Sequence, residues 1–290
     1  MGPWSNTSPE TIVVPIANTE TATRQLETAV DLAADRSARI VLVYVCAVPP
    51  QLSLQDGRRY LVTAEDEQLL EDAAASVTSH GLAVDTRIRL ARGVSRGIVG
   101  AVDAYDADTI VLGWRGRPPR QNVMLGSHVD RVLRDAECDV LVKRIQTPTE
   151  TVDGVLVPVA EGPHAEFAAE TAAAIARQND ASITLLHVRD TADPERSETD
   201  ARALLAETAA DIEDVHSVDR KLVAAGDVAG TITDWTATHD VTVLGVSRGG
   251  LVQRKLLGSI SRAVGRHAAG TVILAKRYDS VPSRLKRLFS

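Results

Sequence analysis

Glycine and serine residues between positions 113 and 127 have the types and the spacing of a phosphate-binding loop. The stretch VLGWRGRPPRQNVMLGS (111–127) places Gly113 and Gly116 after an apolar run and closes with Gly126 and Ser127. Glycine lets the backbone approach a ligand closely, because it has no β-carbon. A helix starting at Gly126–Ser127 would present free amide hydrogens and a positive dipole end to an anion. A plain strand-to-helix connection has the same glycines, so the residues alone leave both interpretations open.

The loop between these glycines carries two cations whose role is also open. Arg117 and Arg120 can close over a polyphosphate, or they can be solvated surface charges. Which of these two roles the arginines have depends on the strand and the helix that position the loop.

The two halves of the chain repeat one another. Three stretches in the first half have counterparts in the second: TIVVPIANTETA (11–22) and GVLVPVAEGPHA (154–165), DTIVLGWRG (108–116) and DVTVLGVSRG (240–249), CDVLVKR (138–144) and GTVILAKR (270–277). Self-similarity on this scale indicates a duplicated domain. We expect one domain over residues 1–147, a second over 152–278 and a tail over 279–290.

Each copy is predicted to alternate buried strands with helices. Strands are expected near 11–16, 39–46, 83–90, 109–113 and 139–143, with helices near 20–36, 60–80, 94–106 and 126–136. In the second copy, strands are expected near 154–159, 182–188, 218–223, 241–245 and 271–275. The pattern predicts an α/β fold with two tandem Rossmann-like, three-layer domains, each with a five-stranded parallel sheet. Such sheets bind ligands at the carboxyl ends of their strands, where the glycine stretch begins.

Composition limits the classes of function and location. The net charge of −7 argues against a broad nucleic-acid surface, which needs clustered cations. Cys46 and Cys138 lie in or beside apolar runs and are expected to be buried thiols rather than disulfide or zinc ligands. No apolar run reaches the ~18 residues of a membrane span, and the N-terminus lacks a signal core. A soluble, cytoplasmic protein without a transmembrane segment is expected.

The glycine spacing, with nine residues between the second glycine and Gly-Ser, resembles the nucleotide motif of the universal stress protein superfamily. The resemblance extends over nearly the whole chain as two copies, including the VPI and VPV strands and the LVKR and LAKR ends. It implies a five-stranded parallel sheet and a stress-response role as a sensor or regulatory module. It also implies binding of ATP or another adenine nucleotide without a known hydrolytic step, and it leaves a requirement for magnesium open.

The resemblance also implies which residues bind the nucleotide. Val45 would contact the adenine through its backbone, and the glycines, the serine and the amide of His128 would hold the phosphates and the ribose. The implied site is Val45, Gly113, Gly116, Gly126, Ser127 and His128. Ala17 departs from the pattern, because ATP-binding members have an aspartate there. Weaker binding than is usual for the family is therefore expected.

The second copy departs further from the motif. Ala160 stands at the end of its first strand, and Arg248 replaces the second glycine, although Gly249 follows. Arg248 either fills the phosphate position or supplies a cation to it, and we favour the first, because glycine serves there for close backbone approach. The predicted degenerate site consists of Val188, Gly245, Arg248, Gly258 and Ser259. One nucleotide per chain is expected.

Catalysis is not expected, and a second class of function stays open. His128 and His164 are predicted at helix starts, without a nucleophile or carboxylate placed beside them, so the protein is not expected to be an enzyme. The alternative is a nucleotide-independent module that regulates a membrane transporter, because domains of this family also occur fused or adjacent to transporters. The tail sequence SRLKRLFS (283–290) is either a short basic amphipathic element or a frayed terminus.

The last strands of the two copies are expected to meet. Domains of this family commonly pair through the edge of the last strand, which predicts an intramolecular pseudo-twofold dimer of DVLVKR (139–144) and TVILAKR (271–277). Pairing covers two strand edges that would otherwise promote aggregation. A homo-oligomer of the whole chain also stays open.

Overall fold

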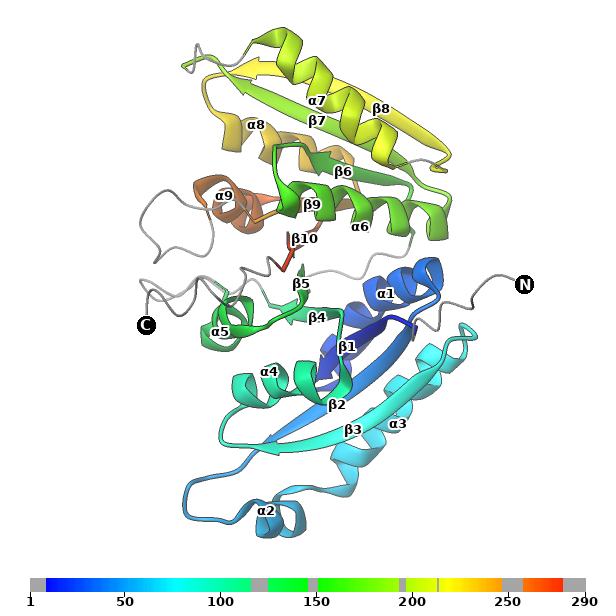
Figure 1. Ribbon diagram of the computed structural model, residues 1–290, viewed down its shortest axis with the longest axis vertical. Coiled ribbons are helices and arrows are strands. Elements are labelled where there is room, and N and C mark those ends of the chain that lie inside the picture. The colour runs from blue at the N-terminus through cyan, green and yellow to red at the C-terminus, as the bar shows by residue number, and fades with distance from the viewer. Residues whose placement is uncertain are drawn as a thin grey trace, which may run out of the picture. The chain divides into compact units, whose positions relative to one another are not determined.

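The computed structural model describes residues 9–115, 125–145, 151–192, 197–212, 214–246 and 258–278. The chain divides into two compact units, Met1–Val111 and Leu112–Ser290, and the division falls inside strand β4 (Thr109–Trp114). Strands and helices alternate along the chain in both units (Figure 1). This alternation is the α/β class that the sequence predicts.

The first unit is a parallel sheet with helices packed on it. Its strands are β1 (Thr11–Ile16), β2 (Arg39–Ala47), β3 (Val84–Ala91) and the first half of β4, in the order β3-β2-β1-β4. Its helices are α1 (Thr19–Arg36), α2 (Leu54–Leu61), α3 (Ala64–Thr78) and α4 (Val94–Tyr105). Ile12, Val13 and Val14 in β1 are fully buried, as expected for a central strand of a parallel sheet.

One polar side chain fixes helix α1 on this sheet. Gln25 is buried, and its amide nitrogen donates to the carbonyl oxygens of Pro15 at 3.1 Å and Val111 at 2.6 Å. These carbonyls belong to neighbouring strands, so one amide satisfies both of them. The bond holds α1 against the carboxyl ends of β1 and β4.

The helix predicted near 60–80 is present as α3, from Ala64 to Thr78, but a separate helix, α2, precedes it and was not predicted. Helix α2 ends at Leu61, and Val62 is extended, with φ −84° and ψ 126°. Thr63 then starts α3 with a capping box, in which the Asp66 amide donates to the Thr63 hydroxyl and the Thr63 amide donates to the Asp66 carboxylate. The cap stabilises a new helix start inside the predicted helix.

The second unit contains six further strands. They are β5 (Asp139–Arg144), β6 (Gly154–Pro158), β7 (Ser182–Asp190), β8 (Ser217–Ala225), β9 (Val241–Gly245) and β10 (Thr271–Lys276), in the order β5-β10-β9-β6-β7-β8. The helices of this unit are α5 (Ser127–Asp135), α6 (Pro163–Asn179), α7 (Glu198–Asp211), α8 (Val228–Trp235) and α9 (Ser259–His267), with a 3₁₀ turn at Thr236–Thr238. From β10 to β8 the strands are parallel.

The last strands of the two sequence copies lie side by side in this unit. β5 and β10 pair antiparallel, with Ile273 opposite Lys143 and Lys276 opposite Val140. The predicted meeting of DVLVKR and TVILAKR is therefore present as a strand pair. The pairing of β5 with β10 also explains why β5 falls in the second compact unit, although its sequence belongs to the first copy.

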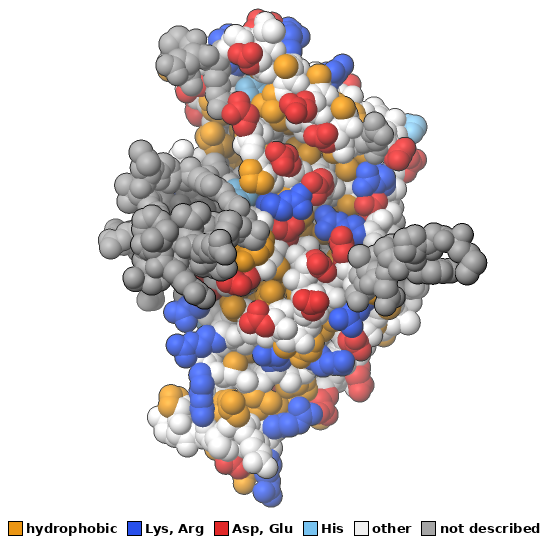
Figure 2. All heavy atoms as spheres, in the orientation of Figure 1, with side chains coloured by type: hydrophobic (Ala, Val, Ile, Leu, Met, Phe, Trp, Pro, Cys, Tyr) orange, Lys and Arg blue, Asp and Glu red, His pale blue; other side chains and the backbone are white. Residues whose placement is uncertain are grey.

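The described surface mixes charged and apolar side chains. On the face drawn in Figure 2, acidic and basic groups are interspersed over the residues that are described. None of the described helices is long and apolar enough to cross a membrane. Cys46 and Cys138 are buried thiols, as predicted, and neither is in a disulfide; burial raises the pKa of the Cys46 thiol.

Candidate functional site

The predicted phosphate loop ends at a helix start that requires glycine. Gly126 precedes α5 with φ +107° and ψ 147°, a backbone conformation that other residues rarely adopt. The first turn closes with the Asp130 amide donating to the Gly126 carbonyl at 3.0 Å, and no side chain caps the helix. The amides of this first turn therefore have the arrangement that binds anions at helix starts.

The corresponding helix start in the second copy has an ordinary backbone. Gly258 precedes α9 with φ −66° and ψ 172°, which any L-residue can adopt. Like α5, α9 has no side-chain cap. The two helix starts thus share their Gly-Ser sequence, but only the first depends on glycine for its backbone.

The other residues predicted for the first site lie on several elements. Gly113 is half-buried in β4, whereas Ser127 and His128 are exposed in the first turn of α5. Gly116, Arg117 and Arg120 lie outside the described residues.

Val45 and Ala17 belong to the first unit. Val45 is half-buried in β2, and its side chain packs against α4, because a β-carbon on Gly97 would lie 2.3 Å from Val45 Cγ1. Ala17 is exposed directly after β1. It stays a prediction that Val45 and the loop glycines together form one nucleotide site.

A cavity of about 430 Å³ lies in the second copy, at the carboxyl ends of β6, β7 and β9. Its volume is in the usual range for small-molecule sites. Most of its lining is aliphatic, from the strand ends and from α6, α8 and α9; the lining residues that the argument uses are Val159, Glu161, His164, His187, Val188, Gly245 and Ser261. Val188 and Gly245 belong to the predicted degenerate site, and Gly258 and Ser259 come directly before lining residues of α9. Arg248 and Gly249 lie outside the described residues.

Gly245 has a packing role that its place in the motif does not reveal. A β-carbon there would lie 2.6 Å from the main-chain carbon of His164 and 2.7 Å from the nitrogen of Ala165. Strand β9 therefore touches the backbone of the first turn of α6. Because a larger residue would displace α6, Gly245 shapes the cavity wall through close packing.

Three polar side chains of the lining are hydrogen-bonded within the protein. Buried His187 lies with Nδ1 3.0 Å from the Val159 carbonyl oxygen, and since a carbonyl only accepts, Nδ1 carries the hydrogen. The Ser261 hydroxyl donates to the Gly245 carbonyl at 3.1 Å. His164 Nδ1 accepts from the main-chain N–H of Arg277 at 3.1 Å. An apolar cavity with a few fixed polar groups is suited to binding rather than to acid–base chemistry.

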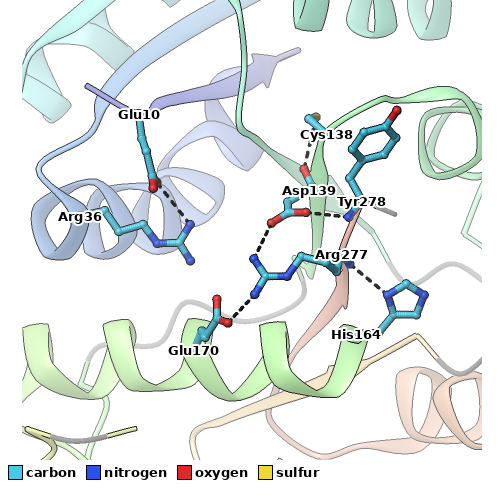
Figure 3. Close-up of polar contacts among 8 residues, drawn as sticks. All are labelled: Glu10, Arg36, Cys138, Asp139, His164, Glu170, Arg277 and Tyr278. Carbon is cyan, nitrogen blue, oxygen red and sulfur yellow. Dashed lines mark hydrogen bonds and ion pairs between the residues drawn. The ribbon is translucent and has the colours of Figure 1, made fainter. Parts of the chain in front are cut away.

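A charged cluster borders this cavity where the chain leaves β10. The Arg277 guanidinium lies between two carboxylates, donating to Asp139 Oδ2 at 3.1 Å and to Glu170 (Figure 3). It also stacks over the Phe167 ring, 4.7 Å from the centroid. Burial alone would lower the pKa of Arg277, but the hydrogen bond and charge of Glu170, together with Asp139, raise it. The guanidinium therefore stays charged.

No motif in the sequence points to this cluster. Asp139 begins β5 and meets Arg277, which follows β10, through the β5–β10 pair, whereas Glu170 meets Arg277 because α6 packs on β10. The one signal in the sequence is the Lys-Arg pair that ends both last strands. In the described ranges, no group of three or more His, Cys, Asp or Glu side chains is placed to hold a metal ion.

Comparisons with known proteins agree with the duplicated architecture. The universal stress protein family matches residues 9–144 and again residues 152–276. Universal stress protein MJ0531 of Methanocaldococcus jannaschii is 27% identical over 137 residues, which cover 45% of this chain and 79% of that protein. A crystal structure of a universal stress protein from Archaeoglobus fulgidus DSM 4304 has a TM-score of 0.69 at 18% identity, covers 93% of this chain and 97% of that chain, and shows likeness of fold.

A membrane protein also matches the chain. The Na(+)/H(+) antiporter NhaS5 of Synechocystis sp. is 26% identical over 180 residues, which cover 61% of this chain but only 26% of the antiporter. This relative is thus matched over a minor part of its length. Because the family matches both sequence copies and thereby most of the chain, the protein belongs to the universal stress protein family.

Proposed function

We propose that the protein is a regulatory module that binds one ATP-type adenine nucleotide in its first copy, residues 1–147. The site consists of the residues that the family motif implies: Val45, Gly113, Gly116, Gly126, Ser127 and His128. The nucleotide acts as a bound signal and is not turned over.

The observation that carries this proposal is the start of helix α5. Gly126 adopts φ +107°, no side chain caps the helix, and a β-carbon on Gly126 would meet no described atom within 4 Å. A helix start with a glycine-only backbone and no side-chain cap can receive a phosphate on its free amides. Gly258 lacks the positive φ, which supports placing the nucleotide in the first copy only.

Ala17 is expected to make this binding weak. Its exposed methyl group stands where ATP-binding relatives have an aspartate, so it cannot accept hydrogen bonds from the ligand. An unmet polar group costs about 1–3 kcal/mol, which corresponds to roughly a ten- to hundredfold loss of affinity.

The experiment is to heat-denature the purified full chain, identify any released nucleotide by chromatography, and titrate the nucleotide-free protein with ATP in a calorimeter. We expect one adenine nucleotide per chain. Two equivalent sites, or no heat of binding with any adenine nucleotide, would contradict the proposal.

A second candidate function is regulation of a membrane transporter, independent of nucleotide. The observation that favours it is the match to an antiporter over 61% of this chain. Removal of residues 280–290 should then leave folding and nucleotide binding intact while weakening membrane association. Membrane association that is unchanged by this truncation would remove the tail from this function.

We also propose how the two copies are organised. Domains over 1–147 and 152–278 form an intramolecular pseudo-dimer through the β5–β10 pair, in a cytoplasmic protein. The antiparallel register of these strands supports a pseudo-twofold axis at their edge.

A further inference from the structure

His164 belongs both to the cavity wall and to the chain that leaves β10. It lies in the first turn of α6, lines the second-copy cavity, and accepts the main-chain N–H of Arg277 on Nδ1 at 3.1 Å (Figure 3). A main-chain N–H can only donate. Nδ1 must therefore carry a lone pair, which an imidazolium does not have.

The bond from His164 is one of several that hold the chain just after β10. The Arg277 guanidinium is paired with Asp139 and Glu170, and the Tyr278 amide donates to Asp139 Oδ1 at 2.7 Å. Among the side-chain types of this cluster, only imidazole ordinarily changes its charge between about pH 5 and 8. The hydrogen bond to His164 is thus the contact that a moderate change of pH can remove.

We propose that His164 is a proton-sensitive latch between the second-copy cavity and the chain that leaves β10. The neutral imidazole holds the Arg277 amide, and protonation at Nδ1 removes the acceptor and frees this amide, while Asp139 still binds the Arg277 guanidinium and the Tyr278 amide. The half-buried ring lies at a cavity wall, where a proton from solvent can reach it.

Among the residues that the structure describes, the charged and titratable groups around the latch come from four elements. On the cavity side they are Glu161, before α6, and His187, on β7; around the released chain they are Glu170 on α6, Asp139 on β5, Lys276 on β10 and Arg277 itself. The two carboxylates already compensate the Arg277 guanidinium. A new imidazolium therefore adds positive charge beside a cation whose partners are engaged, which favours release.

Opening of the latch would free the main-chain N–H of Arg277, directly after β10, without any bound nucleotide. The latch and the proposed nucleotide site are therefore independent proposals, and either can be contradicted without the other.

The test is amide hydrogen exchange of the full chain, resolved by residue with NMR at pH 7.5 and at pH 5.5. The protection factor of the Arg277 amide, which corrects for the intrinsic effect of pH on exchange, should fall roughly three- to tenfold on acidification. The Leu274 amide, inside β10, should keep its protection and so report that the sheet is intact.

Two substitutions separate the latch from general loosening. His164→Asn places an amide oxygen near the position of Nδ1 that does not titrate, so Arg277 should stay protected at both pH values. His164→Phe keeps a ring but has no acceptor, so the protection factor of the Arg277 amide should be low at both pH values. His239→Asn is the matched control: the His239 nitrogens contact Trp235 and Thr184 and do not line the cavity, so the pH response should stay as in the unchanged protein.

Either of two outcomes would overturn the latch. One is an Arg277 protection factor that does not change between the two pH values in the unsubstituted chain. The other is a pH response that persists in His164→Phe, because the proton would then act elsewhere.

Discussion

The Arg144 guanidinium, at the end of β5, donates to the carbonyl oxygen of Gly265 in α9 over 3.1 Å. Its other terminal nitrogen donates to the carbonyls of Ala268 at 2.6 Å and Gly270 at 2.5 Å. Only 3% of Arg144 is exposed, and burial lowers the pKa of its guanidinium. One cation from the first sequence copy thus satisfies three carbonyls at the carboxyl end of a helix of the second, where the helix dipole favours positive charge.

Replacement of Arg144 by Met should destabilise the protein by about 2–3 kcal/mol, because buried carbonyls lose their donors while the side-chain length is kept. Urea unfolding, followed by tryptophan fluorescence, measures this cost. Trp114 is a useful probe, since it is buried and a β-carbon on Gly265 would lie 3.5 Å from its ring. Arg202→Ala removes only an exposed ion pair with Glu198 and should cost less than about 0.5 kcal/mol. Equal midpoints for the two variants would show that the Arg144 bonds contribute nothing net.

Substitution of Gly126 by Val should abolish ATP binding, whereas Gly258→Val should leave it nearly unchanged. The reason is the backbone: φ is +107° at Gly126 and −66° at Gly258. A β-branched residue cannot adopt the first conformation without strain, so the first turn of α5 must rearrange. Calorimetric titration with ATP gives the affinities, and thermal unfolding of each variant checks that it is folded. Retained ATP binding in folded Gly126→Val would show that this helix start does not hold the phosphates.

The inner strands were predictable because they are short apolar runs buried on both faces, whereas β3 and β8 carry exposed polar side chains. TIVVPI, for example, coincides with β1 from Thr11 to Ile16. Helix α2, which precedes the helix predicted near 60–80, was not predicted, and the contact that positions it is tertiary. Gly57 lets α2 approach the end of β2 so closely that a β-carbon would lie 2.6 Å from Val48 Cγ2, and no periodicity reveals such a contact. The T-x-x-D signal at Thr63, in contrast, is visible in the sequence and marks the start of α3.

The glycine motif was predictable as a pattern, but the cavity and its charged border were not. Asp139 and Arg277 are 138 residues apart, and they meet because two strand edges pair antiparallel. Likewise, Trp114 is only 7% exposed at the end of β4, a packed position that its place in the glycine stretch does not reveal. Long-range contacts of this kind depend on which edges meet, and composition does not encode that.

Tyr44 should give the protein a distinct response to alkaline pH. A hydrogen bond to Asp66, followed by burial and the charges of Asp66 and Cys46, raises the pKa of Tyr44 to about 12. In the unfolded chain a tyrosine titrates near pH 10. The folded state thus retains its proton more strongly, so the stability from this group is fully present below about pH 10 and is lost as pH rises toward 12.

Spectrophotometric titration of the phenolate tests this assignment. The difference between the unsubstituted protein and Tyr44→Phe should be a step with its midpoint near pH 12, and Asp66→Asn should move that step toward lower pH. Tyr60→Phe, which removes an exposed ring, should leave the step in place. A Tyr44 step near pH 10 in the unsubstituted protein would contradict the hydrogen bond to Asp66.

Separate expression of residues 1–147 and 152–278 tests the pairing of the last strands. Each fragment exposes one edge, β5 or β10, which unpaired main-chain groups make prone to association. Mixed fragments should therefore form a 1:1 complex in sedimentation experiments, whereas each alone should self-associate. Asp139→Arg, which sets a cation against Arg277, should weaken the complex, and adding Arg277→Asp in the other fragment should restore part of it by reversing the ion pair. If both fragments are stable monomers that do not associate with each other, the β5–β10 contact is too weak to join the copies. The chain between them must then hold the pseudo-dimer together.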